Sequence, residues 1–330
     1  MARRLLFSAL FSFILTGLYA NDTFFYIAGG NLVPVEQNRT NVEMREETIN
    51  MELFDDHYSV TVDFIFYNNG VDENLLVGFP YLLQKQGGLT ITSIYDFKTW
   101  VNDTPVEYSS NSIKISERGI FERIANHAFT KNVYFPSRQI TRIRVQYNAD
   151  YGEVPYEIMA SYYYGSGRPW DKNIGKITIN IKNNIKKFDA WIYQFDIPHM
   201  NVSDHIKWHG DTMRVTLESI EPAEDDIFQI YLADRLWNHY PPVLTANRFR
   251  DRAGVLDKSK LSLLSSAQLR LLRNAFYALY GYNFRDENLK SIFMDVFKGF
   301  YTVNSNFNEN LFTEAERRNI NMILEEERRR

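Results

Sequence analysis

Apolar and polar residues alternate along the first two thirds of the chain. The alternation is clearest at residues 57–67, where every second residue from Tyr58 to Phe66 is aromatic or valine. A period of two places these side chains on one face of a β-strand. The turn-forming run from Asn68 to Gly70 follows directly. The pattern therefore predicts a strand with one buried face that ends at this turn.

Further short segments repeat this alternation between residues 21 and 240. They are residues 99–108, 140–147, 156–164, 174–181, 188–195, 212–217 and 227–232. The first of them is typical of a hairpin that turns at Asn102 and Asp103. Many short strands separated by turn residues predict an antiparallel β-sandwich. One large sandwich and two smaller ones both fit, and Gly152 and Pro155 mark a plausible division near residues 148–155.

Helical periodicity replaces the strand pattern after Pro241 and Pro242. We expect residues 241–262 to form a linker and residues 263–330 to form a small domain of three helices. The residues expected to cap or end these helices are Ser265 or Ser266, Gly281, Asp286, Gly299, Thr313 and Glu316. The predicted fold class is multidomain and mainly β, with an antiparallel β-sandwich region followed by a small three-helix C-terminal domain.

Residues 1–20 have the features of a secretory signal peptide. Arg3 and Arg4 give a basic start, an apolar run covers residues 5–18, and Ala20 supplies a small residue at the expected cleavage site. An apolar helix of about 14 residues spans roughly 21 Å, which is short of a ~30 Å hydrocarbon core. We therefore expect a cleaved signal peptide, with an uncleaved anchor as the alternative.

The chain contains no cysteine. This composition excludes a lipid-anchored lipoprotein, a disulfide framework, a thiolate metal site and a cysteine nucleophile. Loss of Arg3 and Arg4 with the signal peptide would leave roughly six more acidic than basic residues, which argues against nucleic acid as a partner. We expect an exported protein, periplasmic or extracellular, without a transmembrane span in the mature chain.

A sixteen-letter segment near the C-terminus, LRLLRNAFYALYGYNF, occupies residues 269–284. It resembles the YARHG domain, a small extracytoplasmic bacterial module. The residues that fit the pattern of that domain are Arg273, Asn274, Tyr277, Ala278, Gly281 and Phe284. Leu279 and Tyr280 replace the Arg and His of the family name. The resemblance covers roughly the last 65 residues of the chain.

The amino-terminal region carries GGNLVPV at residues 29–35, a strand that ends in NNG, GFP at residues 78–80, and YYYGSGRPW at residues 162–170. Through these segments it resembles an uncharacterised family of secreted bacterial β-domains. Neither resemblance implies a known catalytic activity.

Residues 162–170 are the first candidate for ligand binding. Tyr164 and Trp170 could stack on flat ligand surfaces such as sugar rings, while Arg168 could bind polar edges. The alternative, which we favour, is a loop whose Trp170 folds back onto the sandwich.

A second candidate set lies in the helical domain and consists of Arg273, Asn274 and Tyr277. Two polar residues within an apolar helical pattern need partners or water. We expect Arg273 and Asn274 to bind backbone carbonyls, and ligand contact is the alternative.

A metal site is considered at His199, His205 and His209, because HIKWH has the four-residue spacing of helical zinc ligands. Gly210 and Asp211 instead indicate a hairpin turn, which places the last histidines on a strand. His205 and His209 would then lie roughly 13 Å apart, too far to share one ion. We predict no metal site and no cofactor.

Two functions are consistent with these motifs. The first is a non-enzymatic envelope protein that binds another envelope protein or a cell-wall glycan, with the helical domain as an accessory contact. The second is an envelope glycan or peptide hydrolase that uses carboxylates at strand ends. No nucleophile elbow, phosphate loop or dinucleotide fingerprint occurs in the sequence, so we favour the first.

Overall fold

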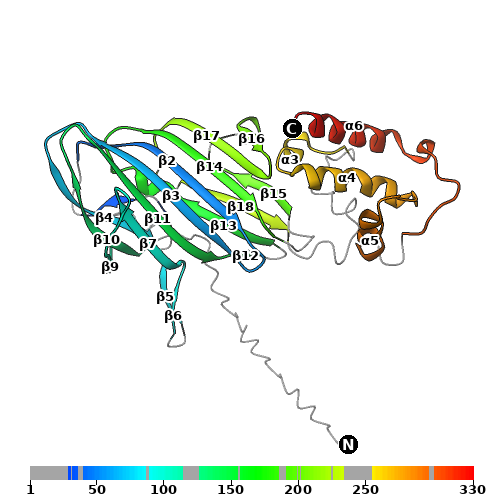
Figure 1. Ribbon diagram of the computed structural model, residues 1–330. Helices are drawn as coiled ribbons and strands as arrows, with labels where there is room; N and C mark the ends of the chain where they lie inside the picture. Colours follow the sequence, from blue (N-terminus) through cyan, green and yellow to red (C-terminus); the bar gives the residue numbers. More distant parts are fainter. Residues whose placement is uncertain are drawn as a thin grey trace, which may run out of the picture.

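A computed structural model of the protein shows a large β body joined to a small helical module (Figure 1). It describes residues 29–30, 32–35, 40–86, 89–113, 126–154, 157–185, 191–198, 200, 202–223, 226–233, 255–296 and 301–330. The predicted signal peptide and most of the predicted linker lie outside these residues.

An eight-stranded sheet forms one layer of the β body. In spatial order its strands are β16 (Ile206–His209), β17 (Thr212–Ile220), β14 (Ile174–Asn183), β2 (Val42–Leu53), β3 (His57–Asn68), β11 (Ile140–Asp150), β7 (Tyr95–Val101) and β8 (Thr104–Pro105). Neighbouring strands run antiparallel except β2 and β14, which run parallel.

Two four-stranded sheets form the second layer. The first has the order β1 (Val33–Pro34), β4 (Glu73–Tyr81), β10 (His127–Phe135) and β9 (Ser109–Ser112). The second has the order β12 (Gly152–Val154), β13 (Glu157–Tyr163), β18 (Ile227–Ala233) and β15 (Trp191–Asp196). An isolated parallel bridge joins Gly30, which precedes β1, to Tyr163 of β13. The separate hairpin of β5 (Leu83–Gln86) and β6 (Leu89–Thr92) projects from the body (Figure 1).

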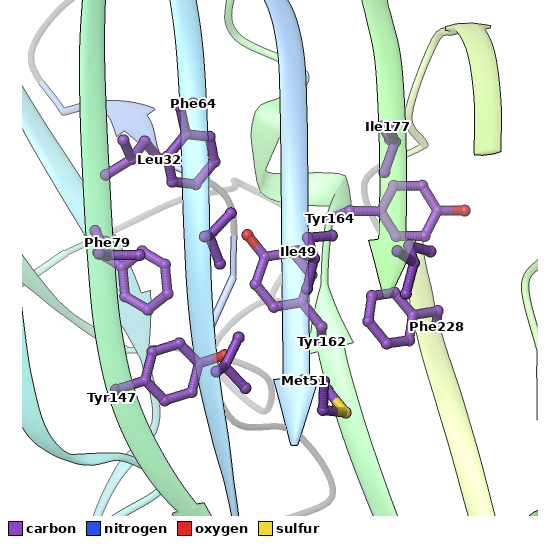
Figure 2. Close-up of a cluster of buried hydrophobic side chains, with 14 of the residues drawn as sticks. Leu32, Ile49, Met51, Phe64, Phe79, Tyr147, Tyr162, Tyr164, Ile177 and Phe228 are labelled. Carbon is purple, nitrogen blue, oxygen red and sulfur yellow. The ribbon is translucent and has the colours of Figure 1, made fainter. Parts of the chain in front are cut away.

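One continuous hydrophobic core fills the space between the two layers. Figure 2 shows Ile49 and Phe64 of the eight-stranded sheet together with Phe79, Tyr162 and Phe228 of the second layer. These side chains come from all three sheets and are almost fully buried. The β body is therefore a single large sandwich whose second layer is divided.

The predicted strand at residues 57–67 is confirmed as β3, whose residues alternate between buried and half-buried along its length. The predicted hairpin at residues 99–108 is also confirmed, because Asn102 and Asp103 both have positive φ, at 46° and 63°. Such values suit the two-residue turn that reverses the chain between β7 and β8.

Strand β2 contains a β-bulge at Arg45. Met44 pairs with Phe66 and Glu46 pairs with Ile65, so Arg45 has no pairing partner of its own in β3. The extra residue shifts the alternation, because residues 42 and 44 face inward before it and residues 47, 49, 51 and 53 face inward after it. As a result Glu47 points into the core.

The helical module consists of α3 (Lys258–Leu261), α4 (Ser266–Leu279), α5 (Glu287–Val296) and α6 (Glu314–Arg328). The predicted caps are confirmed: Ser265 and Thr313 each form a capping box, and Asp286 accepts hydrogen bonds from the first turn of α5. Gly281 follows α4 as expected, whereas Gly299 lies outside the described residues. The short helix α3 falls at the end of the predicted linker and is capped by Asp257.

The turn between α3 and α4 connects the two parts of the chain. Leu261 and Leu264 belong to the core of the helical module, whereas Leu263 belongs to the core of the sandwich. Trp208 on the edge strand β16 donates a hydrogen bond from Nε1 to the carbonyl oxygen of Ser262 at 2.8 Å. The module therefore docks against the sandwich through this turn.

Within the described residues, no helix combines the length and hydrophobicity needed to cross a bilayer.

Candidate functional site

The residues nominated at 162–170 are placed in the sandwich core. Tyr164 and Trp170 are each only 4% exposed. The Trp170 indole donates a hydrogen bond from Nε1 to the Leu32 carbonyl oxygen at 2.6 Å, and its ring centre lies 4.5 Å from that of Phe66. Arg168 is exposed at the surface of the same loop. The loop thus closes the core in this conformation, and ligand stacking by its rings stays a prediction.

Arg273 and Asn274 of α4 have partners within the helical module. Asn274 donates from Nδ2 to the Arg270 carbonyl oxygen at 2.7 Å, one turn earlier in the helix. Arg273 instead forms an ion pair with Glu327 of α6, with Nε and Oε2 3.1 Å apart. The Arg273–Glu327 ion pair holds α4 against α6, whereas the Asn274 bond lies within α4. A ligand role for either residue stays a prediction.

The predicted hairpin turn at Gly210 and Asp211 is present between β16 and β17, and it puts His209 at an exposed strand end. His205 precedes that strand in a turn, and His199 lies outside the described residues. Nowhere in the part of the chain that the structure describes do three histidine or carboxylate side chains gather in a metal-binding group.

Tyr277, the remaining nominated residue, belongs to a cluster of aromatic rings at the C-terminal end of α4. Its ring centre lies 5.7 Å from Tyr282, 6.0 Å from Phe307 and 5.0 Å from Phe312. Tyr282 and Phe307 also contact each other, with ring centres 5.0 Å apart. Phe312 is buried beneath the cluster, whereas Tyr277 and Phe307 are half-buried and Tyr282 is 37% exposed. We call Tyr277, Tyr282 and Phe307 the aromatic platform.

Backbone contacts hold the platform together from below. Gly281 ends α4 with a φ of +75°, and its carbonyl oxygen accepts a hydrogen bond from the Asn304 amide at 2.8 Å. The Asn304 side chain also donates to the Tyr280 carbonyl oxygen, and the Tyr301 hydroxyl donates to that of Tyr282. The chain from residue 301 onward is thereby tied across the end of α4, which limits movement of the rings.

Two carboxylates lie beside the tyrosines of this region. The Tyr277 hydroxyl donates to Glu309 Oε1 at 3.3 Å, and the Tyr280 hydroxyl donates to Glu316 Oε2 at 2.8 Å. Burial, together with the neighbouring Glu316, raises the pKa of Tyr280 to about 12, and burial followed by Glu309 raises the pKa of Tyr277. Both phenols therefore stay protonated donors at neutral pH.

The platform offers apolar ring surface with a carboxylate at its border. Rigid, half-exposed Tyr and Phe side chains are the residue types that anchor protein interfaces, since they bury a large area at little cost in conformational entropy. Of the three platform residues only Tyr277 was expected from the sequence, although the density of aromatic residues between 276 and 312 was a signal for the other two.

Two buried charged side chains of the sandwich were also missed. Tyr162 donates a hydrogen bond at 2.7 Å to Glu47 Oε1, and Glu47 is fully buried at the centre of the sandwich. Lys131 of β10 is 5% exposed, and its Nζ donates to Thr99 Oγ1 in the opposite sheet. Burial lowers the pKa of the Lys131 ammonium to about 7. Both groups face the core and connect the two layers.

The structure is thus a β-sandwich that carries a small helical module. Residues 249–328 match the YARHG domain, which confirms the resemblance expected for the C-terminal region. This domain is typical of exported proteins. The match does not extend to the rest of the chain.

Among solved structures, a Legionella pneumophila protein with the provisional name of nutrient binding protein is similar over both parts of the chain. It is 19% identical, its TM-score is 0.52, and the match covers 91% of this chain and 98% of that one. An M1 zinc metallopeptidase from Deinococcus radiodurans matches at 8% identity with a TM-score of 0.32, over 59% of this chain and 42% of its own. The similarity to the Legionella protein concerns the fold alone, and the similarity to the metallopeptidase is too weak to support a conclusion. No curated protein matches the chain.

Proposed function

We propose that this protein is an exported, non-enzymatic binding protein whose helical module contacts a partner protein of the cell envelope through the aromatic platform. The observation that carries the proposal is the half-exposed, mutually packed group of Tyr277, Tyr282 and Phe307. The name of the similar Legionella protein also favours a binding role over catalysis.

The composition of the platform favours a protein partner over a sugar. Leu279 and Leu311, which lie next to the platform in sequence, are 37% and 40% exposed and add apolar surface to the module. Half-exposed, mutually packed tyrosines are typical of protein interfaces, in which a few aromatic anchors carry most of the binding free energy. Glu309 at the border would give the interface a charged rim.

Site-specific photocross-linking in cells tests the proposal. A photoreactive phenylalanine analogue is placed at position 282 or 307, and a control is placed at Met294, an exposed residue of α5 in the same module. We expect a discrete cross-linked protein from positions 282 and 307 that is weak or missing from position 294. Equal cross-linking at all three positions, or none at 282 and 307, would contradict the proposal.

A second measurement separates the alternatives. Purified protein is incubated with peptidoglycan, and both sedimentation of the protein and release of soluble fragments are recorded. If the protein sediments with peptidoglycan and Tyr282→Ala abolishes this binding, the partner of the platform is cell-wall glycan and not a protein. Release of fragments would favour the hydrolase that the sequence left open.

A further inference from the structure

Arg45 in the sandwich stacks on an aromatic ring and binds a carboxylate at the same time. Its guanidinium carbon lies 3.6 Å from the centre of the Tyr67 ring, and its Nε donates to Glu43 Oε1 at 2.8 Å. A planar guanidinium suits this combination, because its face covers the ring while its edge donates to the acid. A ring with a neighbouring carboxylate is therefore an arginine site that this protein already uses.

Arg330 makes the same pair of contacts at the junction of the two parts of the chain. Its guanidinium lies over the Trp208 ring, and its Nη2 donates to Glu326 Oε1 at 3.3 Å. The ring and the acid belong to different elements in this case, β16 and α6. The arrangement thus recurs on two unrelated backbones, which indicates that the side chains alone define it.

The aromatic platform supplies a ring and a carboxylate in this combination. The Tyr277 hydroxyl donates to Glu309 Oε1 at 3.3 Å, so the exposed acid lies directly beside the rings. Asn308 accepts a hydrogen bond from the Asn310 amide at 3.1 Å, which caps the short turn that carries Glu309. A carboxylate has about four acceptor positions, so the bond from Tyr277 leaves room for further donors.

The rings of the platform are also suited to a cation. The Tyr282 ring is inclined by 75° to the rings of both Tyr277 and Phe307, so the ring faces point in different directions. Burial, followed by Glu309, raises the pKa of Tyr277, and the phenol keeps its proton at neutral pH. A phenol that donates to a carboxylate has a more electron-rich ring, which attracts a cation more strongly.

Basic residues are missing from the two segments that build the platform. Residues 274–284 contain no charged residue, and residues 299–316 contain no Lys or Arg. The module as a whole, residues 255–330, has more basic than acidic residues, so their absence here is a local feature. The charged residues of the two segments are all acidic: Glu309, Glu314 and Glu316.

The basic residues that border these segments do not occupy the platform. Arg273 is neutralised by Glu327, with Nε and Oε2 3.1 Å apart. Arg285 and Arg317 are exposed, and within the described residues neither makes a cation–π contact with a platform ring. Lys298 lies outside the described residues. The surroundings of the rings therefore favour a cationic group from another molecule over an anionic one.

We propose that the partner protein places an arginine side chain on the platform, where its guanidinium stacks on an exposed ring and hydrogen-bonds to Glu309. This inference rests on the proposed function, since it names the group by which the partner is recognised. The contact repeats between two molecules what Arg45 does within the sandwich.

A matched pair of peptides tests the arginine. The full-length protein is titrated with the acetylated and amidated pentapeptide Gly-Leu-Arg-Leu-Gly, and with the same peptide carrying citrulline, which keeps the shape and removes the charge. The fluorine resonance of para-fluorophenylalanine at position 307 reports binding. We expect the citrulline peptide to bind about fivefold more weakly, a factor typical of one cation–π contact.

The variant Glu309→Gln separates charge from structure. Glutamine keeps an acceptor for the Tyr277 hydroxyl, so the platform should fold unchanged while most of the preference for the arginine peptide is lost. Glu325→Gln, an exposed acid near the end of α6, is the control and should keep the full preference. Equal affinity for the two peptides, no shift at millimolar peptide, or a preference that survives in Glu309→Gln would overturn the inference.

Cross-linking in cells distinguishes this inference from the proposed function. With the photoreactive residue at position 307, Glu309→Gln should lower the yield of cross-linked protein several-fold, and Glu325→Gln should leave it unchanged. A yield that Glu309→Gln does not change would overturn the arginine contact and keep the platform as a binding surface. If no protein cross-links while the arginine peptide still binds, the proposed function fails and the arginine site stands.

Discussion

The guanidinium carbon of Arg330 lies 4.4 Å from the centre of the Trp208 ring, above its face. Arg330 also donates from Nη2 to the carbonyl oxygens of Leu261 and Ser262, each at 3.2 Å. Arg330, two residues beyond the end of α6, thereby reaches the edge strand of the sandwich and the turn that precedes α4. This group of contacts fixes the helical module against the β body.

Replacing Trp208 with Ala should loosen that contact. The variant loses a cation–π interaction and the hydrogen bond to Ser262, together worth about 1–3 kcal/mol. We expect the helical module to unfold at lower temperature than the sandwich, which differential scanning calorimetry would show as a separate transition. Arg329→Ala is the control, because its side chain is 58% exposed and pairs only weakly with Glu326. A single transition at the original temperature in the Trp208 variant would contradict the prediction.

Lys131→Met should stabilise the sandwich at pH 7, because it removes a buried ammonium and keeps the length of the side chain. The pKa of Lys131 is about 7 in the folded protein and near 10.5 when unfolded, so the unfolded chain binds more protons between these values. The free-energy cost of burying the Lys131 ammonium is therefore fully present below pH 7 and falls as the pH rises from 7 towards 10.5.

Urea unfolding at pH 7 and pH 9 measures this difference. The advantage of the Met variant in free energy of unfolding should amount to several kcal/mol at pH 7 and should shrink by about 2 kcal/mol at pH 9. Lys98→Met, on the exposed side of β7, serves as the control and should show neither effect. A pH-independent difference would indicate that the amine is not desolvated.

Tyr162→Phe should destabilise the protein by about 1–3 kcal/mol, since the hydroxyl that donates to the buried Glu47 carboxylate is lost. The double variant Glu47→Leu, Tyr162→Phe removes both polar groups and should recover much of that loss. Chemical denaturation of the two single variants and the double variant forms a mutant cycle. Strict additivity would show that the two side chains do not interact.

Gly281→Ala should disrupt the support of the aromatic platform. A Cβ at Gly281 would lie 2.3 Å from the Thr302 carbonyl oxygen, and its φ of +75° is unfavourable for alanine. We expect a loss of about 2 kcal/mol or more in stability and faster hydrogen exchange in residues 301–312.

Gly210→Ala is a matched control for that substitution. Gly210 also has a positive φ, of +59°, but a Cβ there would meet no atom within 4 Å. Its cost should therefore be limited to backbone strain of about 1–2 kcal/mol, without an effect on the platform. Equal effects of the two substitutions on exchange at residues 301–312 would show that contact with Thr302 is unimportant.

Local signals in the sequence predicted many of the elements, although β2, β4 and β10 were not among the predicted strands. The alternation in β3, the turn at Asn102 and Asp103, and the capping boxes at Ser265 and Thr313 each depend on residues close together in the chain. The mainly β fold class and the helical C-terminal region are confirmed for the same reason.

Arrangements that depend on distant residues were not predictable in this way. The parallel neighbours β2 and β14 are more than a hundred residues apart, so no local pattern selects their direction. For the aromatic run at 162–170 the sequence left both a surface loop and a buried loop open, with the buried loop favoured, and only the packing of Trp170 against Phe66 shows its burial. The platform likewise brings together Tyr282 and Phe307, which α5 and its flanking residues separate in the sequence.

The extra residue at Arg45 has a consequence for comparing this strand with its relatives. A related sequence one residue shorter at this point would lose the bulge but keep its β2 side chains on the same faces, because Glu46 would still pair with Ile65 and Glu47 with Phe64. A sequence that kept the extra residue and paired it with Ile65 would instead turn the following side chains to the opposite face, and its acid at the position of Glu47 would face water. The bulge therefore decides which carboxylate of this strand lies in the interior.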